Sequence, residues 1–455
     1  MAQAEGAVGP AHPGRVNWRA LAVVAGLALV VRLAAVVALD ALSGADAFLI
    51  ADSAAFLHAA HGARELQFMP LYPAFLAAHA ALLGPDPLWP VLSQAVVDSA
   101  TCVVVARIAA ELAPALELPA GVFAALNPTQ VVMATLVLTE TLFVFFAALA
   151  LWAALAWLRR PGWRNAAGLG LVLGLGALTR VMLLPWAVGG TVLLVVLAAA
   201  LRRPLRRAIA QAALALGLAL VQLGPVLAAN YARTGGWGLT NQGGGHALYW
   251  VVPLVIEARD GTPHADGARR MAERFEPAVR AAPDPFSRSR ALGRAALAML
   301  AELGPGPVVE AWAIGAAINL AAPAVILATP VRALPRTGFY ATPGAAKLDK
   351  VWAFLFENDN PLYGWILVVS AAGTIACRAA QGFGLWRGVR AALAGNRALG
   401  AALVLLLAWI GFILLVNGPV ASAKYRAPIE PALAALAALA VRRPGAAAIT
   451  APCKP

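Results

Sequence analysis

Residues 18–42 read WRALAVVAGLALVVRLAAVVALDAL, an apolar run interrupted by Arg19, Arg32 and Asp40. An α-helix needs about 20 apolar residues to cross the hydrocarbon of a bilayer. The run is therefore long enough to span a membrane, and we expect it to be a first membrane helix rather than a cleaved signal. Apolar blocks of similar length recur along the chain, so this first block sets the pattern for the whole fold.

The composition agrees with that reading. Of 455 residues, 61% are apolar and 13% are charged, and the mean hydropathy is +0.76. A soluble domain is about one quarter charged, so a soluble enzyme, a nucleic-acid-binding protein and a disordered chain are excluded. An outer-membrane β-barrel is also excluded, because its strands would alternate apolar and polar residues over about ten positions. The fold class predicted is all-α, a polytopic membrane bundle of about 10–12 transmembrane helices with juxtamembrane helices on the outer face.

The net charge is +13, and the positions of the arginines along the chain predict how the protein is oriented in the membrane. Excess arginine in short connectors marks the cytoplasmic side of a multi-spanning protein. The connectors in question carry Arg159, Arg160 and Arg164, then Arg202, Arg203, Arg206 and Arg207, then the stretch 378–397, and finally Arg442 and Arg443. We therefore expect an integral protein of a bacterial inner (plasma) membrane, with no nucleic-acid partner.

Length and charge bias predict ten crossings. They are 18–42, 89–112, 120–136, 137–158, 166–185, 186–201, 208–229, 362–377, 398–417 and 427–441. The block 308–329 could span, re-enter or lie on the outer surface, and parity favours a segment that does not span. Between residues 257 and 310 eight acids and eight arginines form a balanced stretch, which is typical of solvated structure.

The expected domain organisation follows the crossings. It consists of a cytoplasmic tail (1–17), a transmembrane core (18–229) with a first outer loop (43–88), an extracytoplasmic loop region (230–361) that includes the ambiguous block, the last transmembrane helices (362–441) and a cytoplasmic tail (442–455). The glycine run 243–245 is not followed by phosphate-loop spacing and is expected to be a flexible turn.

Charged residues inside the bilayer are costly and need a partner. Arg32 and Asp98 lie at matched depth on adjacent predicted helices. We expect them to form an ion pair that holds these two helices together, although the same pair is the one feature that would suit a transporter.

A second group of charged residues shares the outer leaflet. It comprises Asp52 in the first outer loop, Glu140, Arg180, and Lys424, Tyr425 and Arg426 before the last helix. Guanidinium and ammonium groups hold phosphate, and a carboxylate can take a proton from an attacking hydroxyl. Other readings stay open: Glu140 as a helix cap, and Lys424 and Arg426 as interfacial anchors.

Several short motifs occur in an order that resembles the GT-C superfamily of membrane glycosyltransferases, in the branch with protein O-mannosyltransferases and the lipid A aminoarabinose transferase. The motifs are Ala51-Asp52-Ser53-Ala54-Ala55-Phe56, Met69-Pro70-Leu71-Tyr72-Pro73, Asn127-Pro128, Leu138-Thr139-Glu140, the run 174–180 ending in Thr179-Arg180, Asn230-Tyr231 with Gly235-Gly236, and Tyr425-Arg426-Ala427-Pro428. The order holds from about residue 20 to 250 and again near the end.

The resemblance implies a many-helix fold and a donor sugar carried on a polyprenyl phosphate. It implies transfer on the outer face, to an acceptor on a glycan, a lipid or a protein. In such enzymes an acid of the first outer loop is the proposed general base, and here that position is Asp52. Many members carry two adjacent acids there, whereas this chain has Asp52 followed by Ser53.

The predicted function is therefore a lipid-phosphosugar-dependent, inverting glycosyltransferase. Asp52 and Glu140 are its expected catalytic residues, and Arg180, Lys424, Tyr425 and Arg426 are expected to hold the donor phosphate. No cofactor is certain; Glu140 could bind a divalent cation or orient Asp52, and no metal ligands are assigned. The alternatives are a polytopic transporter or lipid flippase, which would place its polar groups near the bilayer midplane, and a scaffold subunit without activity.

Overall fold

The computed structural model describes residues 16–62, 66–335, 337–342, 347–357 and 360–442. The two predicted tails lie almost entirely outside these residues, as do Arg443 and Cys453. Within the described ranges the chain is helical and contains no strand, which confirms the predicted all-α polytopic bundle.

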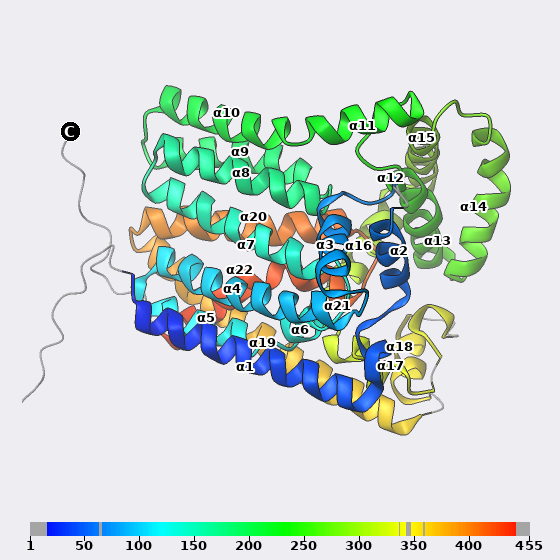
Figure 1. Ribbon diagram of the computed structural model, residues 1–455, viewed down its shortest axis with the longest axis horizontal. Helices are drawn as coiled ribbons and strands as arrows, with labels where there is room; N and C mark the ends of the chain where they lie inside the picture. Colours follow the sequence, from blue (N-terminus) through cyan, green and yellow to red (C-terminus); the bar gives the residue numbers. More distant parts are fainter. Residues whose placement is uncertain (1–15, 63–65, 336, 343–346, 358–359, 443–455) are drawn as a thin grey trace, which may run out of the picture.

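Among the described residues, six helical segments are long and apolar enough to cross a membrane. They are α1 (Trp18–Ser43), α7 (Glu140–Arg159), α9 (Leu183–Ala200), α10 (Leu205–Val221) continued by α11 (Gly224–Thr234), α19 (Pro361–Leu393) and α20 (Arg397–Asn417). Figure 1 shows them side by side with α4 (Leu88–Leu112), α8 (Trp163–Thr179) and α22 (Glu430–Val441). Each predicted crossing overlaps helical structure, and the count of ten crossings stays a prediction, because six of the described segments have the length and composition of a span.

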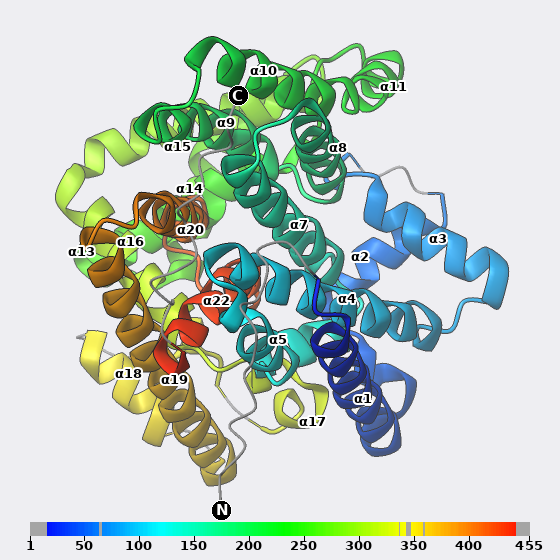
Figure 2. The same cartoon turned by 90° about the vertical axis from the view of Figure 1, so that its left-hand side faces the viewer.

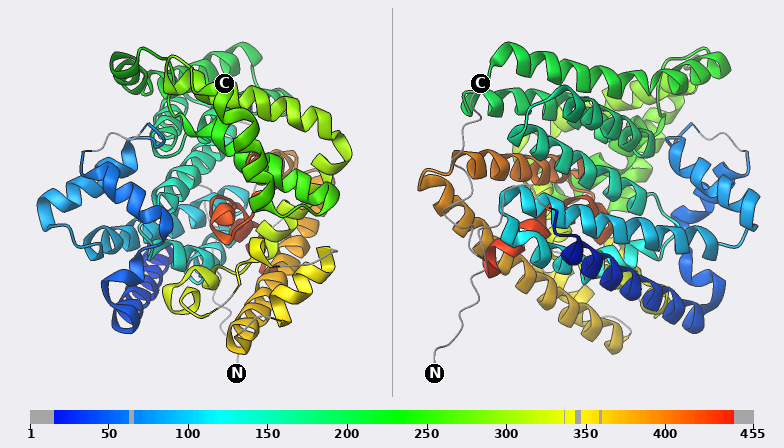
Figure 3. Two further views of the ribbon diagram at one scale, coloured as in Figure 1. Left: turned by 90° about the vertical axis from the view of Figure 1, so that its right-hand side faces the viewer. Right: turned by 60° about the vertical axis from the view of Figure 1, so that its left-hand side comes forward.

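Ten of the other helices gather at one end of the bundle, on the right in Figure 1, which we call the loop end. They are α2 (Ala51–Ala60), α3 (Leu71–Leu83), α12 (Gln242–His246), α13 (Val252–Asp260), α14 (His264–Val279), α15 (Pro285–Leu303), α16 (Pro305–Ala321), α17 (Thr329–Arg332), α18 (Lys347–Phe356) and α21 (Ala423–Arg426). The connectors between α7 and α8, α9 and α10, and α19 and α20 lie at the opposite end (Figure 3). We call this the arginine end, because the predicted positive clusters fall there.

Several predicted helix boundaries are wrong. The expected helices 166–185 and 186–201 are divided earlier, since α8 ends at Thr179 and α9 begins at Leu183, and the expected helix 208–229 is divided between α10 and α11. The expected helix 120–136 is two helices, α5 (Glu117–Ala125) and α6 (Pro128–Ala134). Pro128 cannot donate a backbone hydrogen bond, and the Asn127 side chain caps α6 by accepting from the N–H of Thr129 at 2.8 Å. The expected inner connector 378–397 begins too early, because α19 continues to Leu393 and Arg378 lies inside it.

The glycine run expected to be a flexible turn forms α12 instead. A Cβ on Gly244 would lie 1.8 Å from the carbonyl oxygen of Ser289, so glycine is what allows α12 to contact α15. The chain continues through one π-helical turn, Ala247–Val251. Pro253 explains that turn, because a proline has no N–H for the carbonyl of Tyr249, four residues earlier.

The centre of the bundle is occupied by α22, which other helices surround in Figure 2. Its inward residues are small, with Ala432, Ala435 and Ala438 fully buried. A Cβ on Gly384 of α19 would lie 1.9 Å from the carbonyl oxygen of Leu436. Small residues let membrane helices approach closely. This packing fixes the start of α22, and with it α21, at the loop end.

Candidate active site

The helix that carries Asp52 is tied to the bend before α7. Ser53, which is buried, donates its hydroxyl to the carbonyl of Val137 at 2.9 Å and accepts from the N–H of Ile50 at 3.0 Å. The N–H of Val137 in turn donates to the carbonyl of Phe48 at 2.9 Å. The residue beside Asp52 is therefore an anchor of the first outer loop, and Asp52 itself keeps half of its side chain exposed.

Glu140 opens α7 immediately after that bend, and its side chain is buried. Arg180, the residue that ends α8, donates to Glu140 Oε1 at 2.7 Å. The guanidinium also lies over the ring of Phe143, 5.5 Å from its centroid. A buried carboxylate needs such a partner, because removing a charge from water is costly. Arg180 remains one quarter exposed, so part of its guanidinium can reach a ligand.

Lys424 brings the end of the chain to the first outer loop. Its ammonium Nζ lies 2.5 Å from Asp52 Oδ2, and 5.1 Å from the ring centroid of Tyr425. Burial alone would lower the pKa of Lys424, but Tyr425, Glu140 and Asp52 together raise it above its ordinary value. The lysine therefore stays charged at neutral pH and lies within electrostatic reach of both predicted catalytic acids.

The turn that presents Lys424 is held by amide side chains. Asn319, at the end of α16, accepts from the N–H of Ser422 at 2.9 Å and donates to the carbonyl of Val420 at 3.2 Å. Asn417 donates to the carbonyl of Tyr425 at 2.9 Å. Backbone groups outside helices need such partners when they are buried, so the turn has a defined shape.

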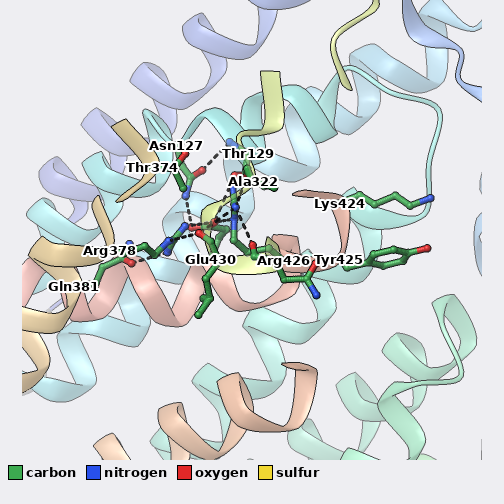
Figure 4. Close-up of polar contacts among 12 residues, drawn as sticks. Asn127, Thr129, Ala322, Thr374, Arg378, Gln381, Lys424, Tyr425, Arg426 and Glu430 are labelled. Carbon is green, nitrogen blue, oxygen red and sulfur yellow. Dashed lines mark hydrogen bonds and ion pairs between the residues drawn. The ribbon is translucent and has the colours of Figure 1, made fainter. Parts of the chain in front are cut away.

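Arg426 faces away from this group. Figure 4 shows Lys424 and Tyr425 directed to one side and Arg426 directed into a buried cluster on the other. Arg426 is fully buried and donates to Glu430 at 2.6 Å and to the hydroxyl of Thr129 at 2.7 Å. Its remaining N–H groups donate to carbonyls at the end of α16. Its donors therefore bond to groups of the protein, whereas a residue that binds the donor phosphate would need donors directed to the ligand.

The cluster around Arg426 contains residues that the sequence did not indicate. Arg378 of α19 donates to Glu430 at 2.8 Å, and Asn127 donates to the other oxygen of Glu430 at 2.8 Å. One carboxylate thus faces two guanidinium groups. The partial negative charge of the α16 C-terminus, whose carbonyls accept from both arginines, offsets the second positive charge. The Arg426–Glu430 spacing of four was the available signal.

The expected pair of Arg32 and Asp98 is present at 2.7 Å, and both side chains are buried. Arg32 also donates to the carbonyls of Ala124 and Ala125, where α5 ends. Gln130 of α6 donates to the second oxygen of Asp98 at 3.3 Å. The pair thus hydrogen-bonds to groups that lie at the break between α5 and α6, so its role is structural.

His246, at the end of α12, joins the charged group without having been predicted. Burial, and then the positive charges of Arg180 and Lys424, lower the pKa of His246 below its ordinary value of 6.5. The ring is therefore neutral at pH 7. No motif marked this histidine, since it follows a glycine run and lies far along the chain from its neighbours.

The described residues bring together Asp52, Glu140, Arg180, Lys424 and Tyr425 at the loop end, with His246 beside them, and they leave Arg426 apart. In the whole of the chain that the structure describes, no group of three or more His, Cys, Asp or Glu side chains could hold a metal ion. The divalent cation suggested for Glu140 stays a prediction.

Comparison with known proteins agrees with the resemblance predicted from the sequence. Residues 68–227 match the family described as dolichyl-phosphate-mannose-protein mannosyltransferase. The matched segment begins within the first outer loop, just before α3, and ends in α11; it includes Glu140 and Arg180 but neither Asp52 nor Lys424. No curated protein matches the chain. The match confirms the predicted likeness to GT-C mannosyltransferases and identifies a membrane glycosyltransferase as the class it resembles.

Proposed function

We propose that this protein transfers a sugar from a polyprenyl-phosphate carrier to an acceptor hydroxyl on the extracytoplasmic face, with inversion at the anomeric carbon. The family match supports a membrane glycosyltransferase with a lipid-phosphate sugar donor. The extracytoplasmic side is supported by the charge bias, because the loop end lies opposite the arginine-rich connectors.

The observation that carries the proposal is the meeting of two ion pairs. Asp52 contacts Lys424, Glu140 contacts Arg180, and the charges of Glu140 and Asp52 both act on Lys424. Two cations beside one half-exposed acid suit a phosphate and a general base. Fixed charges aimed at a leaving phosphate are the type of electrostatic stabilisation that contributes most to such steps.

The Asp52–Lys424 pair defines a resting arrangement. When a phosphate binds, it competes with Asp52 for Lys424, and the carboxylate becomes available to the acceptor. Arg180 is oriented by Glu140 and supplies the second contact to the phosphate. Glu140 is thus a positioning residue, and Asp52 is the base.

The chemical step then balances without a further reactant. Asp52 takes the proton of the acceptor hydroxyl, and the acceptor oxygen forms a bond to the anomeric carbon. The bond from that carbon to the phosphate oxygen breaks, and the polyprenyl phosphate leaves with the bonding electrons, stabilised by Arg180 and Lys424. Attack opposite the leaving phosphate inverts the anomeric carbon.

The test uses purified protein in lipid nanodiscs with a panel of polyprenyl-phosphate sugars that includes dolichyl-phosphate mannose. Release of polyprenyl phosphate and labelling of envelope fractions are measured. We expect Asp52→Asn to lower kcat by about 10²- to 10⁴-fold, the usual contribution of a general base. Asp46→Asn, an exposed acid of the same outer loop, is the matched control and should retain full activity.

An Asp52→Asn variant as active as the wild type would remove Asp52 from the mechanism. Movement of the lipid across vesicles without sugar transfer would favour the transporter instead. Addition of EDTA tests the divalent cation suggested for Glu140. Loss of activity that Mg²⁺ or Mn²⁺ restores would show that the cation is required, whereas unchanged turnover would leave the positive charge to Arg180 and Lys424.

A further inference from the structure

A cavity of about 660 Å³ lies at the loop end, next to the charged group. Its walls come from three separate parts of the chain: the first outer loop at Gln67, the segment from Asn241 to Trp250, and the turn from Arg280 into α15. A volume of this size is typical of small-molecule sites. None of these segments belongs to the predicted crossings.

The three parts are fixed to one another rather than loosely apposed. The N–H of Asn241 donates to the carbonyl of Leu66 at 3.0 Å, which joins the 235–241 loop to the first outer loop. The N–H of Gly244 donates to the hydroxyl of Ser289 at 3.0 Å, which joins α12 to α15. The cavity is therefore a built feature of the fold.

The π-helical turn directs two aromatic rings to the cavity. Tyr249 and Trp250 lie within Ala247–Val251, and both line the wall. The hydroxyl of Tyr249 donates to Glu276 at 2.9 Å, and burial followed by this bond raises the pKa of Tyr249 to about 12. Trp250 is 44% exposed. π-turns recur at functional sites, and here the turn supplies aromatic surface.

Some polar side chains of the lining have hydrogen-bond or ion-pair partners among the described residues, and others do not. Asp284 caps α15, and Arg288 pairs with Glu276, so these side chains have protein partners. Asn241, Gln242 and Arg280 also line the cavity. In the part of the chain that the structure describes, their side chains make no hydrogen bond or ion pair. Two amides and a guanidinium thus offer donors and acceptors to a ligand.

His246 connects the cavity to the candidate active site. It lines the cavity wall, and it lies within electrostatic reach of Arg180 and Lys424. A molecule held in the cavity would therefore have one end near the two cations and Asp52. That is the position an acceptor must take relative to the donor.

We infer that this cavity is the acceptor subsite and that it takes a carbohydrate, an inference that rests on the proposed function. A sugar ring has an apolar face of C–H groups that packs on aromatic rings such as Trp250, and hydroxyls at its edge that pair with Asn241, Gln242 and Arg280. An extended peptide is the competing class, because aromatic-lined grooves also bind peptides, and the amide and guanidinium groups of the lining favour the hydroxyl-rich sugar.

The first measurement is direct binding to the full chain in nanodiscs. The probes are maltotriose, cellotriose and mannotriose, with a serine- and threonine-rich peptide as the competing class. We expect at least one trisaccharide to bind the wild type. Trp250→Ala and Gln242→Ala should each weaken that binding by about tenfold, equivalent to about 1.4 kcal/mol. Trp237→Ala is the matched control, because Trp237 is more exposed and stacks on Tyr231 away from the cavity; it should bind normally.

The second measurement separates this inference from the proposed function. The KM for the acceptor should rise in Trp250→Ala, whereas Trp237→Ala should keep the wild-type KM and the wild-type release of polyprenyl phosphate to water when no acceptor is present. Failure of every trisaccharide to bind the wild type overturns the inference, as does peptide binding that Trp250→Ala abolishes. If a trisaccharide binds but the donor is not cleaved, the proposed transferase activity is overturned and the inferred carbohydrate site is supported.

Discussion

Glu140 is buried against Arg180 and is the one carboxylate among the described residues that forms an ion pair with that guanidinium, which also lies over the ring of Phe143. We expect Glu140→Gln to raise the KM for the donor by about 10- to 100-fold with a smaller fall in kcat, because a charge-assisted hydrogen bond contributes about 1.5–3 kcal/mol. Steady-state kinetics in nanodiscs measure the two constants separately. The double variant with Arg180→Gln should be no worse than the worse single variant, since both act on one contact.

Glu111 provides the control for that experiment. It is also a buried glutamate paired with an arginine, Arg159, at the arginine end of the bundle. Glu111→Gln should lower thermal stability without changing the KM for the donor. Equal kinetic effects from both glutamates would show that the Glu140–Arg180 pair is merely structural.

His246 gives the folded protein a pH dependence whose sign is fixed. Burial, Arg180 and Lys424 lower its pKa in the folded state, while the unfolded chain titrates near 6.5. The unfolded state therefore binds more protons as the pH falls below about 6.5, and stability decreases until the folded pKa is passed. The unfolding temperature in detergent should fall less between pH 7 and pH 5 for His246→Gln than for the wild type. The exposed His61, changed to Gln, should leave the wild-type slope unaltered.

Among the elements, the start of α22 depends on one carboxylate. Glu430 pairs with both Arg426 and Arg378 and is 1% exposed. Glu430→Gln leaves the buried guanidinium of Arg426 and the partly buried one of Arg378 without their counter-charge, so we expect a loss of about 3–5 kcal/mol. Thermal unfolding in detergent tests this, with Glu302→Gln on the exposed face of α15 as the control. An unfolding temperature equal to that of the wild type would contradict the assigned role of the cluster.

The sequence was sufficient for the elements whose signal is local. Apolar length predicted the helices of the six segments that could span a membrane, and matched depth predicted the Arg32–Asp98 pair. It failed where tertiary contacts decide. Long-range contacts stabilise the break at Asn127-Pro128, since Glu430 accepts from the Asn127 side chain and Arg32 donates to the carbonyl of Ala124. The glycine run is helical where α15 packs against it. Arg426 and Lys424 are two residues apart, and only the surrounding helices direct one inward and the other outward.

At the scale of the whole molecule, the two ends of the bundle are predicted to face opposite sides of the membrane. Arg203 lies in the connector between α9 and α10, and Gly261 in the turn between α13 and α14. A reporter fused after Arg203 should behave as cytoplasmic and one after Gly261 as external, by the excess of arginine in the first connector. Fusions with a fluorescent protein and with a phosphatase measure this. Matching locations for both sites would refute the topology.

The contact between Asp52 and Lys424 joins residues 372 positions apart. During synthesis the outer loop is made early, and chains fold from the N-terminus onward. The lysine arrives only after nearly all of the membrane helices have been inserted. An unfinished polypeptide therefore has the acid without its cation, and on the proposed mechanism it could not yet hold the donor phosphate with both cations.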